Sequence, residues 1–458
     1  MEIIQNAFIQ YHDPNTELPF PLLENTNSFG IIQVNINPST VVKLPHQHLV
    51  FTIDKSGSMN YVCKDNKTKI DHIIFTLENM IRLFSQVNSC PISIHVNTFD
   101  DNAETCVKTV TVTVENAKEI SGKIKKIRPK SSTNIEKALK YSNKHIEDYI
   151  TQHPEHEITH IFLTDGVPTT GSIVTSYLKS LVSEKYANIF IGYGADHDAY
   201  LMTELSSNKK GSYLFIDALE KASFIYGEII HNLLNKVAEV TIHCVNCEVY
   251  NYITNEWCSE LYVGSLSKGN EKIYQVRSSD PNNSSFSISF NNNTFSYYPI
   301  KDFTNCTKYA FRQRTQELLY QVKCDIFNKR EMCYTSNTEN KLKEEIHSFL
   351  NLLMGYIKTN QLEEDKFLKM LCDDLYISHN TLGTEYAGIY TCARQTSQGR
   401  QTTYNVSLNE FYSCEIPELH NLSRNTAFYT LSDNLDSPYA TQDILDTMRN
   451  ISYRDEDS

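Results

Sequence analysis

The feature that most constrains the fold of this chain is a regular alternation of strand and helix patterns between residues 46 and 235. The apolar run at 48–53 predicts a buried strand, and apolar residues at helical spacing over 70–84 predict a helix. The pattern repeats, with strands predicted at 92–99, 158–163, 187–192 and 211–216 and helices at 135–149, 172–186, 197–205 and 219–237. Repeated strand–helix units predict an α/β fold with a doubly wound, mostly parallel, Rossmann-like sheet. The alternating segment 107–114 is expected to be an antiparallel strand at its edge.

We place this predicted domain at 46–236. The segments on either side of it have a different pattern of apolar and polar residues. Residues 240–252 and 273–298 alternate like antiparallel strands, separated by turns rich in Asn, Ser and Gly. The segment 31–42 shares this pattern. We therefore predict that the N-terminal segment contributes a strand to a β-sandwich-like region at 237–303, through which the α/β domain is threaded.

Helical spacing returns after this region. Residues 308–322 and 342–357 predict helices within a helical region at 304–371. An apolar stripe in the second helix is interpreted as core packing, with a groove for a partner helix as the alternative; it consists of Leu342, Ile346, Phe349, Leu350, Leu353 and Ile357. Residues 372–458 are rich in Ser, Thr, Asn and Gln, and we expect an irregular acidic tail.

Charge and composition exclude several classes of function. The 458 residues carry a formal charge of −13, and nucleic-acid affinity depends on Lys and Arg that neutralise phosphates, so we expect no nucleic-acid partner. No run of about 18 apolar residues is present, which excludes a predicted membrane span. The start, Met1 to Pro14, lacks the pattern of a signal peptide, so we expect an intracellular, cytoplasmic protein with reduced thiols.

The 12 cysteines include a single CxxC spacing, formed by Cys244 and Cys247, with Cys258 nearby. A structural zinc site normally needs a second matched pair of ligands, which the sequence lacks. The two cysteines of the pair would also point to opposite faces of the predicted strand. We therefore interpret them as core thiols rather than zinc ligands.

Oxygen-bearing side chains gather at the carboxyl ends of the predicted parallel strands, where open α/β sheets place their sites. Asp54, Ser56 and Ser58 alternate along the loop after the first strand, Thr133 lies in a loop before a helix, and Asp165 follows the strand at 158–163. Two carboxylates and three hydroxyls, without thiolate or imidazole, suit a hard divalent cation, Mg²⁺ first, with Ca²⁺ or Mn²⁺ as alternatives. The simpler alternative is that these residues only cap helices and turns.

This arrangement resembles the von Willebrand factor type A (VWA) domain and its metal-ion-dependent adhesion site (MIDAS). The family pattern is Asp-x-Ser-x-Ser, then a distant Thr, then a distant Asp after a strand, and all five positions are present here. The resemblance implies that the two serines bind the metal directly, that the aspartates often act through water, and that the threonine engages when a ligand is bound. One departure is Ser132, which precedes Thr133 where family members often have glycine.

The leading functional hypothesis is a non-enzymatic binding protein. The resemblance implies that the bound cation captures an acidic residue of a partner protein. Lys126, Arg128 and Lys130 crowd the approach to the Thr133 loop. A solvated helix end is the favoured interpretation of these residues, and a basic rim for such a partner is the functional alternative. In the tail, Ile444, Met448 and Ile451 are helically spaced and predict a short helix that docks on a partner or on the metal face.

Two alternatives stay open at this point. One is a Mg²⁺-dependent phosphatase-like enzyme that uses Asp54 as nucleophile, but Ser56 occupies the position where such enzymes carry a second Asp as general acid. The other is an adaptor related to VWA proteins of ubiquitin ligases. The cysteines after Cys258 lack the spacing of a RING domain, which argues against it.

Overall fold

The structure is a computed structural model that describes residues 4–22, 28–37, 44–63, 66–194, 197–216, 222–290, 293–300, 302–332, 337–384, 386–401 and 438–452. The chain divides into two compact units. The α/β unit consists of Val42–Asn235 and Gln442–Ser458, and the flanking unit consists of Met1–Val41 and Lys236–Thr441. Within the described ranges, no helix is both long and apolar enough to cross a membrane.

The α/β unit is built on a six-stranded sheet in the order β5-β4-β3-β6-β7-β8. Its strands are β3 (Gln47–Asp54), β4 (Ile92–Phe99), β5 (Ala103–Thr111), β6 (Glu157–Thr164), β7 (Ala187–Tyr193) and β8 (Gly211–Ile216). All neighbouring strands pair in parallel except β5, which is antiparallel to β4 at the edge. The predicted doubly wound, mostly parallel sheet is therefore confirmed.

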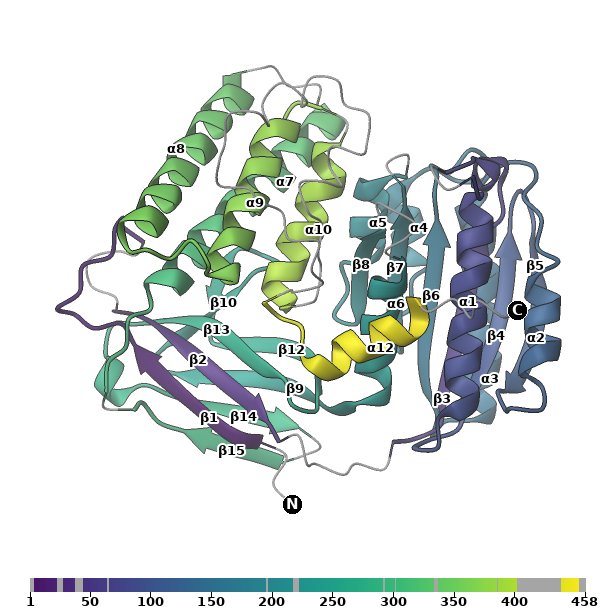
Figure 1. Ribbon diagram of the computed structural model, residues 1–458, viewed down its shortest axis with the longest axis horizontal. Coiled ribbons are helices and arrows are strands. Elements are labelled where there is room, and N and C mark those ends of the chain that lie inside the picture. The colour runs from purple at the N-terminus through teal and green to yellow at the C-terminus, as the bar shows by residue number, and fades with distance from the viewer. Residues whose placement is uncertain are drawn as a thin grey trace. The chain divides into compact units, whose positions relative to one another are not determined.

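Helices cover both faces of this sheet (Figure 1). They are α1 (Lys69–Gln86), α2 (Ala117–Ile124), α3 (Ile135–Gln152), α4 (Thr175–Ser180), α5 (Ala199–Leu205) and α6 (Ala222–Leu234). Because the sheet is covered on two sides, every residue of β3 and of β4 is buried, including the polar residues that alternate with apolar ones along β4.

Two predicted helices were too long. The helix expected at 172–186 is only the six-residue α4, in which Leu178 alone is buried, so the segment has little apolar surface to hold a longer helix in place. The helix expected at 219–237 ends as α6 at Leu234, and β9 begins at Lys236. Val237 belongs to that strand, where β-branched residues are favoured.

The flanking unit contains two antiparallel sheets, in the orders β1-β2-β13-β10-β11 and β12-β9-β14-β15. Their strands are β1 (Ile4–Tyr11), β2 (Ser28–Ile36), β9 (Lys236–Val245), β10 (Glu248–Asn251), β11 (Glu256–Cys258), β12 (Glu260–Ser267), β13 (Glu271–Ser278), β14 (Ser285–Phe290) and β15 (Asn293–Tyr297). β2 pairs with β13, so the predicted pairing of an N-terminal strand with strands after the α/β domain is confirmed. Residues 38–42 of the expected strand lie outside the described residues.

The helices of the flanking unit are α7 (Thr307–Met332), α8 (Asn337–Thr359), α9 (Lys366–Thr381) and α10 (Ala387–Arg400). All six residues of the predicted apolar stripe lie on α8 in one buried cluster with α7 and α9, which confirms core packing. The expectation of an irregular tail from residue 372 onward is wrong for α9 and α10. α10 is buried along almost its whole length, and its Arg394 forms an ion pair with Asp374 of α9, with 3.0 Å between Nε and Oδ1.

The C-terminal segment returns to the α/β unit as helix α12 (Gln442–Ser452), where a helix was predicted. It packs against α6 and α1, and Ile444 and Leu445 are buried. In Figure 1, α12 crosses α6 in the lower half of the view, whereas the arrows of β4 and β6 point to the opposite, upper edge of the sheet. The helix therefore covers a helical face rather than the carboxyl edge of the sheet. Residues 453–458 lie outside the described residues.

Candidate metal centre

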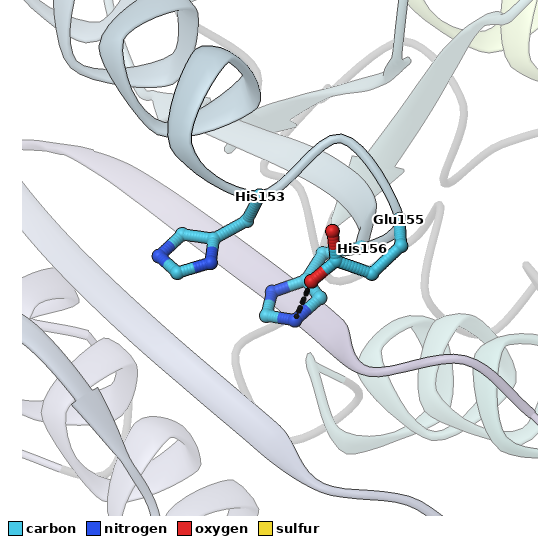
Figure 2. A group of neighbouring side chains, drawn as sticks. All are labelled: His153, Glu155 and His156. Carbon is cyan, nitrogen blue, oxygen red and sulfur yellow. Dashed lines mark ion pairs between the residues drawn. The ribbon is translucent and has the colours of Figure 1, made fainter.

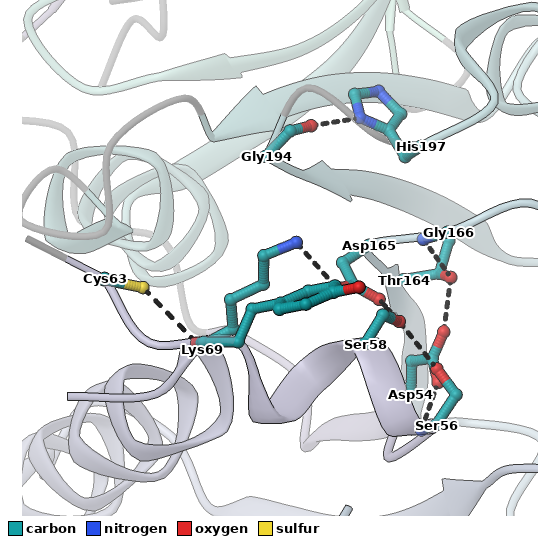
Figure 3. Close-up of polar contacts among 11 residues, drawn as sticks. Asp54, Ser56, Ser58, Cys63, Lys69, Thr164, Asp165, Gly166, Gly194 and His197 are labelled. Atoms are coloured by element: carbon teal, nitrogen blue, oxygen red, sulfur yellow. Dashed lines mark hydrogen bonds and ion pairs between the residues drawn. The ribbon is translucent and has the colours of Figure 1, made fainter. Parts of the chain in front are cut away.

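The candidate site lies at the carboxyl edge of the sheet, where β3 and β6 end (Figure 3). These strands are parallel neighbours, paired along their length, so Asp54 at the end of β3 and Asp165 just after β6 are brought close together. Both carboxylates are fully buried. Ser56 and Ser58 follow Asp54 in the same loop, and Ser58 lies in the short 3-10 helix η1 (Gly57–Asn60).

The carboxylate of Asp54 is fixed by hydrogen bonds to both of its oxygens. The backbone N–H of Ser56 donates to Oδ1 at 2.7 Å, and the hydroxyl of Thr164 donates to Oδ2 at 2.6 Å. Burial raises the pKa of Asp54 to about 7, partly offset by the hydrogen bonds from Thr164 and Ser56, while the nearby Asp165 raises it further. A cation in this site would favour the ionised carboxylate.

The two serines form a chain of hydroxyls that ends on Asp165. The Oγ atoms of Ser56 and Ser58 are 3.2 Å apart, and the hydroxyl of Ser58 donates to Oδ1 of Asp165 at 2.7 Å. The sequence-predicted alternation therefore holds in space, because both hydroxyls face the same side of the loop as the two carboxylates.

Thr133 reaches the same space from the loop before α3. A Cβ atom added to Gly166 would lie 3.7 Å from Oγ1 of Thr133 and 3.9 Å from Oγ of Ser58, so both hydroxyls border the volume above Gly166. The backbone of Thr133 is held by the loop after Asp165, since its N–H donates to Oγ1 of Thr169 at 2.8 Å and its carbonyl accepts from the N–H of Thr169 at 2.9 Å.

Backbone hydrogen bonds also join the first loop to the Thr133 loop. The N–H of Gly57 donates to the carbonyl of Ser131 at 2.9 Å, and the N–H of Lys130 donates to the carbonyl of Lys55 at 2.8 Å. Ser131 has a φ of 62°, a left-handed conformation that lets the loop turn toward Gly57. The three loops are thus preorganised as one framework, and all five predicted residues lie on it.

Lys69, the first residue of α1, is part of this site and was missed by the sequence analysis. Its Nζ lies 2.8 Å from Oδ2 of Asp165, and the exposed fractions of the two side chains are 11% and 0%. Figure 3 shows the ammonium group directed at that carboxylate. A lysine in the first helical turn opposes the helix dipole, which is the sequence signal that could have marked it. The start of α1 is fixed by a capping box between Thr68 and Asp71.

The residues present fit a divalent cation. The donor set consists only of oxygens, and the buried carboxylates of Asp54 and Asp165 share one edge with three hydroxyls. Such a set matches the preference of Mg²⁺ for oxygen ligands and leaves room for water in its octahedral shell. The hydroxyls of Thr133 and Ser58 both approach the space over Gly166, so both could contribute to such a shell.

The predicted basic rim is only partly available to a partner. Lys126 is exposed, and Lys130 is exposed with its Nζ 4.0 Å from Asp100. Arg128 instead donates to the backbone carbonyls of Lys125 and Ile127, at 2.6 and 2.7 Å, and so binds the end of its own helical segment.

Exposed apolar side chains lie on the loops around the site. Those on the segments that follow Ser58 and Asp165 are Tyr61, Val62, Val167, Ile173 and Val174. Apolar groups gathered near a polar centre are typical of protein-binding surfaces.

The cysteines at the CxxC spacing differ from the sequence-based prediction. β9 ends at Val245, and Asn246 adopts a left-handed φ of 55°, so the strand does not continue to Cys247. The thiol of Cys247 is buried and donates to the carbonyl of Ser285 at 3.4 Å, whereas Cys244 on β9 is half-buried. Among the residues that the structure describes, these cysteines do not belong to any group of three ligands close enough to hold a metal ion.

The structure contains an α/β domain with an oxygen-lined candidate cation site at the carboxyl edge of its sheet. Residues 48–227 match the family model of the von Willebrand factor type A domain, so this part of the chain is a VWA domain. VWA domains are metal-dependent adhesion and protein-binding modules that bind a divalent metal at the MIDAS. A comparison with curated protein sequences finds no significant match.

One solved structure with a TM-score above 0.5 covers more of the chain than the VWA domain. A von Willebrand factor type A protein from Catenulispora acidiphila has a TM-score of 0.53 and 10% identity, covering 80% of this chain and 89% of that chain. The ArnB paralog VWA2 from Sulfolobus acidocaldarius has a TM-score of 0.47 and 15% identity over 87% and 99% of the two chains. Proximal thread matrix protein 1 from the mussel byssus, solved with a zinc-occupied MIDAS motif, has a TM-score of 0.34 and 21% identity over 43% and 47%. At 10% identity the first of these likenesses shows the fold alone.

Proposed function

We propose that this protein is an intracellular, metal-dependent binding protein whose VWA domain captures an acidic side chain of a partner protein through a divalent cation. The observation that carries the proposal is the convergence of five oxygen donors on one buried edge of the sheet: Asp54, Ser56, Ser58, Thr133 and Asp165. Mg²⁺ is the proposed cation because all the donors are hard oxygens.

The charges around the site support an anionic ligand. The carboxylates of Asp54 and Asp165 together balance one divalent cation. The ammonium group of Lys69 adds a further positive charge at 2.8 Å from Asp165, so the loaded site carries a net positive charge. When bound, the cation supplies an electrophilic centre for an oxygen ligand of the partner. The hydroxyls of Ser56 and Ser58 would hold the cation directly, and Thr133 lies where it would contact the completed shell.

The surroundings of the site favour a protein over a small anion as ligand. The exposed apolar side chains around the loops, among them Tyr61, Val167 and Ile173, would pack against a partner and exclude water from the metal contact. Lys126 and Lys130 are exposed and would steer an acidic partner toward the edge of the sheet, with an effect that weakens at high salt.

We also propose that the site binds rather than catalyses. Both oxygens of Asp54 accept hydrogen bonds, from Ser56 and Thr164, which hold the carboxylate in place instead of leaving it free to attack phosphorus. Ser56, two residues later, offers no carboxyl group as general acid. Turnover of a generic phosphatase substrate with Mg²⁺, lost in Asp54→Asn, would contradict this part of the proposal.

The binding proposal is tested in two steps. Calorimetric titration with Mg²⁺ should show one site in the wild type and at least a tenfold loss of affinity in Asp54→Asn and Ser58→Ala. Asp148→Asn, which changes an exposed carboxylate near the C-terminal end of α3, is the matched control and should keep the affinity. Capture of partner proteins should then require Mg²⁺ and be lost in EDTA and in Asp165→Ala. Equal Mg²⁺ affinity in all variants would refute the assignment.

A further inference from the structure

A second group of metal-binding side chains lies at the opposite, amino-terminal edge of the same sheet. His153, Glu155 and His156 occupy the turn between α3 and β6, and one potential ligand atom of each lies within 4.8 Å of the others (Figure 2). We propose that this turn binds a transition metal ion of the Zn²⁺ type, independently of the cation at the other edge. Because β3 and β6 span the sheet between the two edges, the sites are about 23 Å apart, at about 3.3 Å per residue.

The backbone conformation of this turn brings the three side chains close enough to bind one metal ion. The N–H of His156 donates to the carbonyl of His153 at 3.2 Å, which closes a single β-turn over four residues. Pro154 occupies the second position, where its fixed φ favours the turn and lowers the entropy cost of ordering it. The turn is anchored at both ends, because α3 ends at Gln152 and β6 begins at Glu157.

The ring of His156 is held so that one nitrogen stays available. Its Nδ1 lies 2.8 Å from the hydroxyl oxygen of Tyr149, and its ring stacks on that of His46 with centroids 4.0 Å apart and planes 9° apart. Tyr149 can in turn donate to Oγ of Ser93, 3.3 Å away, so Nδ1–H of His156 has an acceptor. With its proton on Nδ1, His156 would offer the lone pair of Nε2 to a metal ion, an arrangement in which a neighbouring group orients a metal-binding histidine.

The distances between ligand atoms fit a Zn²⁺ ion. Nε2 of His156 lies 3.1 Å from Oε1 of Glu155. Two ligands about 2.0–2.1 Å from a tetrahedral Zn²⁺ are about 3.3 Å apart, so these two atoms need almost no movement to share an ion. The ring of His153 is parallel to that of His156, with centroids 4.8 Å apart and planes 6° apart. It would have to rotate about its Cβ–Cγ bond to aim a nitrogen at the same ion.

The donor chemistry distinguishes this site from the one beside Asp54. Two imidazoles and one carboxylate suit Zn²⁺ and neighbouring transition metals, whereas Mg²⁺ prefers oxygen ligands alone. Three protein ligands leave a fourth position for water. Glu155 is 68% exposed, so the site is open to solvent and a metal can enter it without unfolding the turn.

Calorimetric titration of the full-length protein with Zn²⁺, in excess Mg²⁺ to occupy the site beside Asp54, tests this proposal. We expect one Zn²⁺ per chain, about tenfold weaker binding in Glu155→Gln and a larger loss in His156→Ala. Glu147→Gln removes the charge of another exposed glutamate on α3 and should leave Zn²⁺ binding unchanged. Because Glu155 is exposed, Glu155→Gln should fold normally, which a thermal melt verifies.

Asp54→Asn separates the two sites. It should abolish Mg²⁺ binding and keep Zn²⁺ binding if the ion goes to the His153–His156 turn. Zn²⁺ binding that is lost in Asp54→Asn but retained in Glu155→Gln and His156→Ala would place the ion in the oxygen site and overturn the proposal. Absence of stoichiometric Zn²⁺ binding to the wild type would overturn it as well, and would leave Glu155 and His156 as a surface ion pair only.

Discussion

Replacing Lys69 with methionine should make the stability of the α/β unit depend on a divalent cation. In the structure the ammonium group of Lys69 compensates the buried carboxylate of Asp165 from 2.8 Å, close to the equally buried Asp54. Lys69→Met keeps most of the aliphatic chain and removes the charge. Without metal, two buried carboxylates then lie at one edge of the sheet with no cation to offset them.

The expected size of this effect follows from the burial of the pair. Removing one partner of a buried ion pair costs about 3–5 kcal/mol, because the remaining charge is left uncompensated. For a unit of about 200 residues, 1 kcal/mol shifts the melting temperature by about 2–4 °C. Lys69→Met should therefore melt about 6–20 °C below the wild type in EDTA. In saturating Mg²⁺ the cation replaces the lost charge, so the difference should shrink to a few degrees.

Thermal melts followed by far-UV circular dichroism measure this effect in EDTA and in Mg²⁺. The matched control is Lys55→Met, because Lys55 is also buried and lies 3.5 Å from Asp100, outside the five oxygen residues. Its melting temperature should fall by the same amount with and without Mg²⁺. The single tryptophan, Trp257, lies on β11 of the flanking unit, and its fluorescence transition should not move in Lys69→Met. A destabilisation of Lys69→Met that is identical in EDTA and Mg²⁺ would refute the reasoning.

Three further predictions concern other parts of the chain. Burial lowers the pKa of His48 to about 2 and of His160 to about 4, so the unfolded state binds more protons than the folded state between pH 7 and pH 5. The α/β unit should therefore lose about 2 kcal/mol of stability per histidine over this range. Urea titrations that give equal stability at both pH values would contradict this prediction. Arg394→Leu leaves Asp374 without its cation and should cost about 3–5 kcal/mol at pH 7.5. Because burial raises the pKa of Asp374 to about 6, the carboxyl group becomes largely neutral at pH 5 and the cost of the substitution should shrink there. Unfolding followed by tryptophan fluorescence measures this, and an equal loss of stability at both pH values would argue against it. Ile444 is buried where α12 packs on α6, so Ile444→Asp should detach α12 and destabilise the α/β unit by about 2–4 kcal/mol. Hydrogen exchange in α6 should become faster. Unchanged exchange would show that α12 contributes little to the stability of the unit.

Much of the α/β unit could be predicted because its strands are buried on both faces. β3 contains an apolar run and β4 alternates apolar and polar residues, so both patterns predict strands. The loops that follow them carry polar residues at positions set by the sheet edge. The five oxygen-bearing residues could therefore be placed at this edge from their positions after the predicted strands and from the resemblance to the VWA pattern. Their metal ligation itself stays a prediction.

The features that the sequence did not reveal depend on distant contacts. Lys69 meets Asp165 across 96 positions of the chain, and no local pattern records such a pairing. α10 was missed for a different reason. Its buried face contains Thr391, Gln395 and Gln398, whose polar side chains give no apolar stripe, so a pattern search sees an irregular segment where the structure has a central helix.

The pairing of β2 with β13 sets an order of events during synthesis. Ser28 lies opposite Ser278, so this sheet can close only after the ribosome has made the whole VWA domain that separates the two strands. Until then β2 has one unpaired edge, which is a template for aggregation. The α/β unit also includes α12, which is synthesised after all the described helices and strands of the flanking unit. A nascent chain that stops early therefore leaves both units incomplete, with an open strand edge and an uncovered helix that chaperones and proteases recognise.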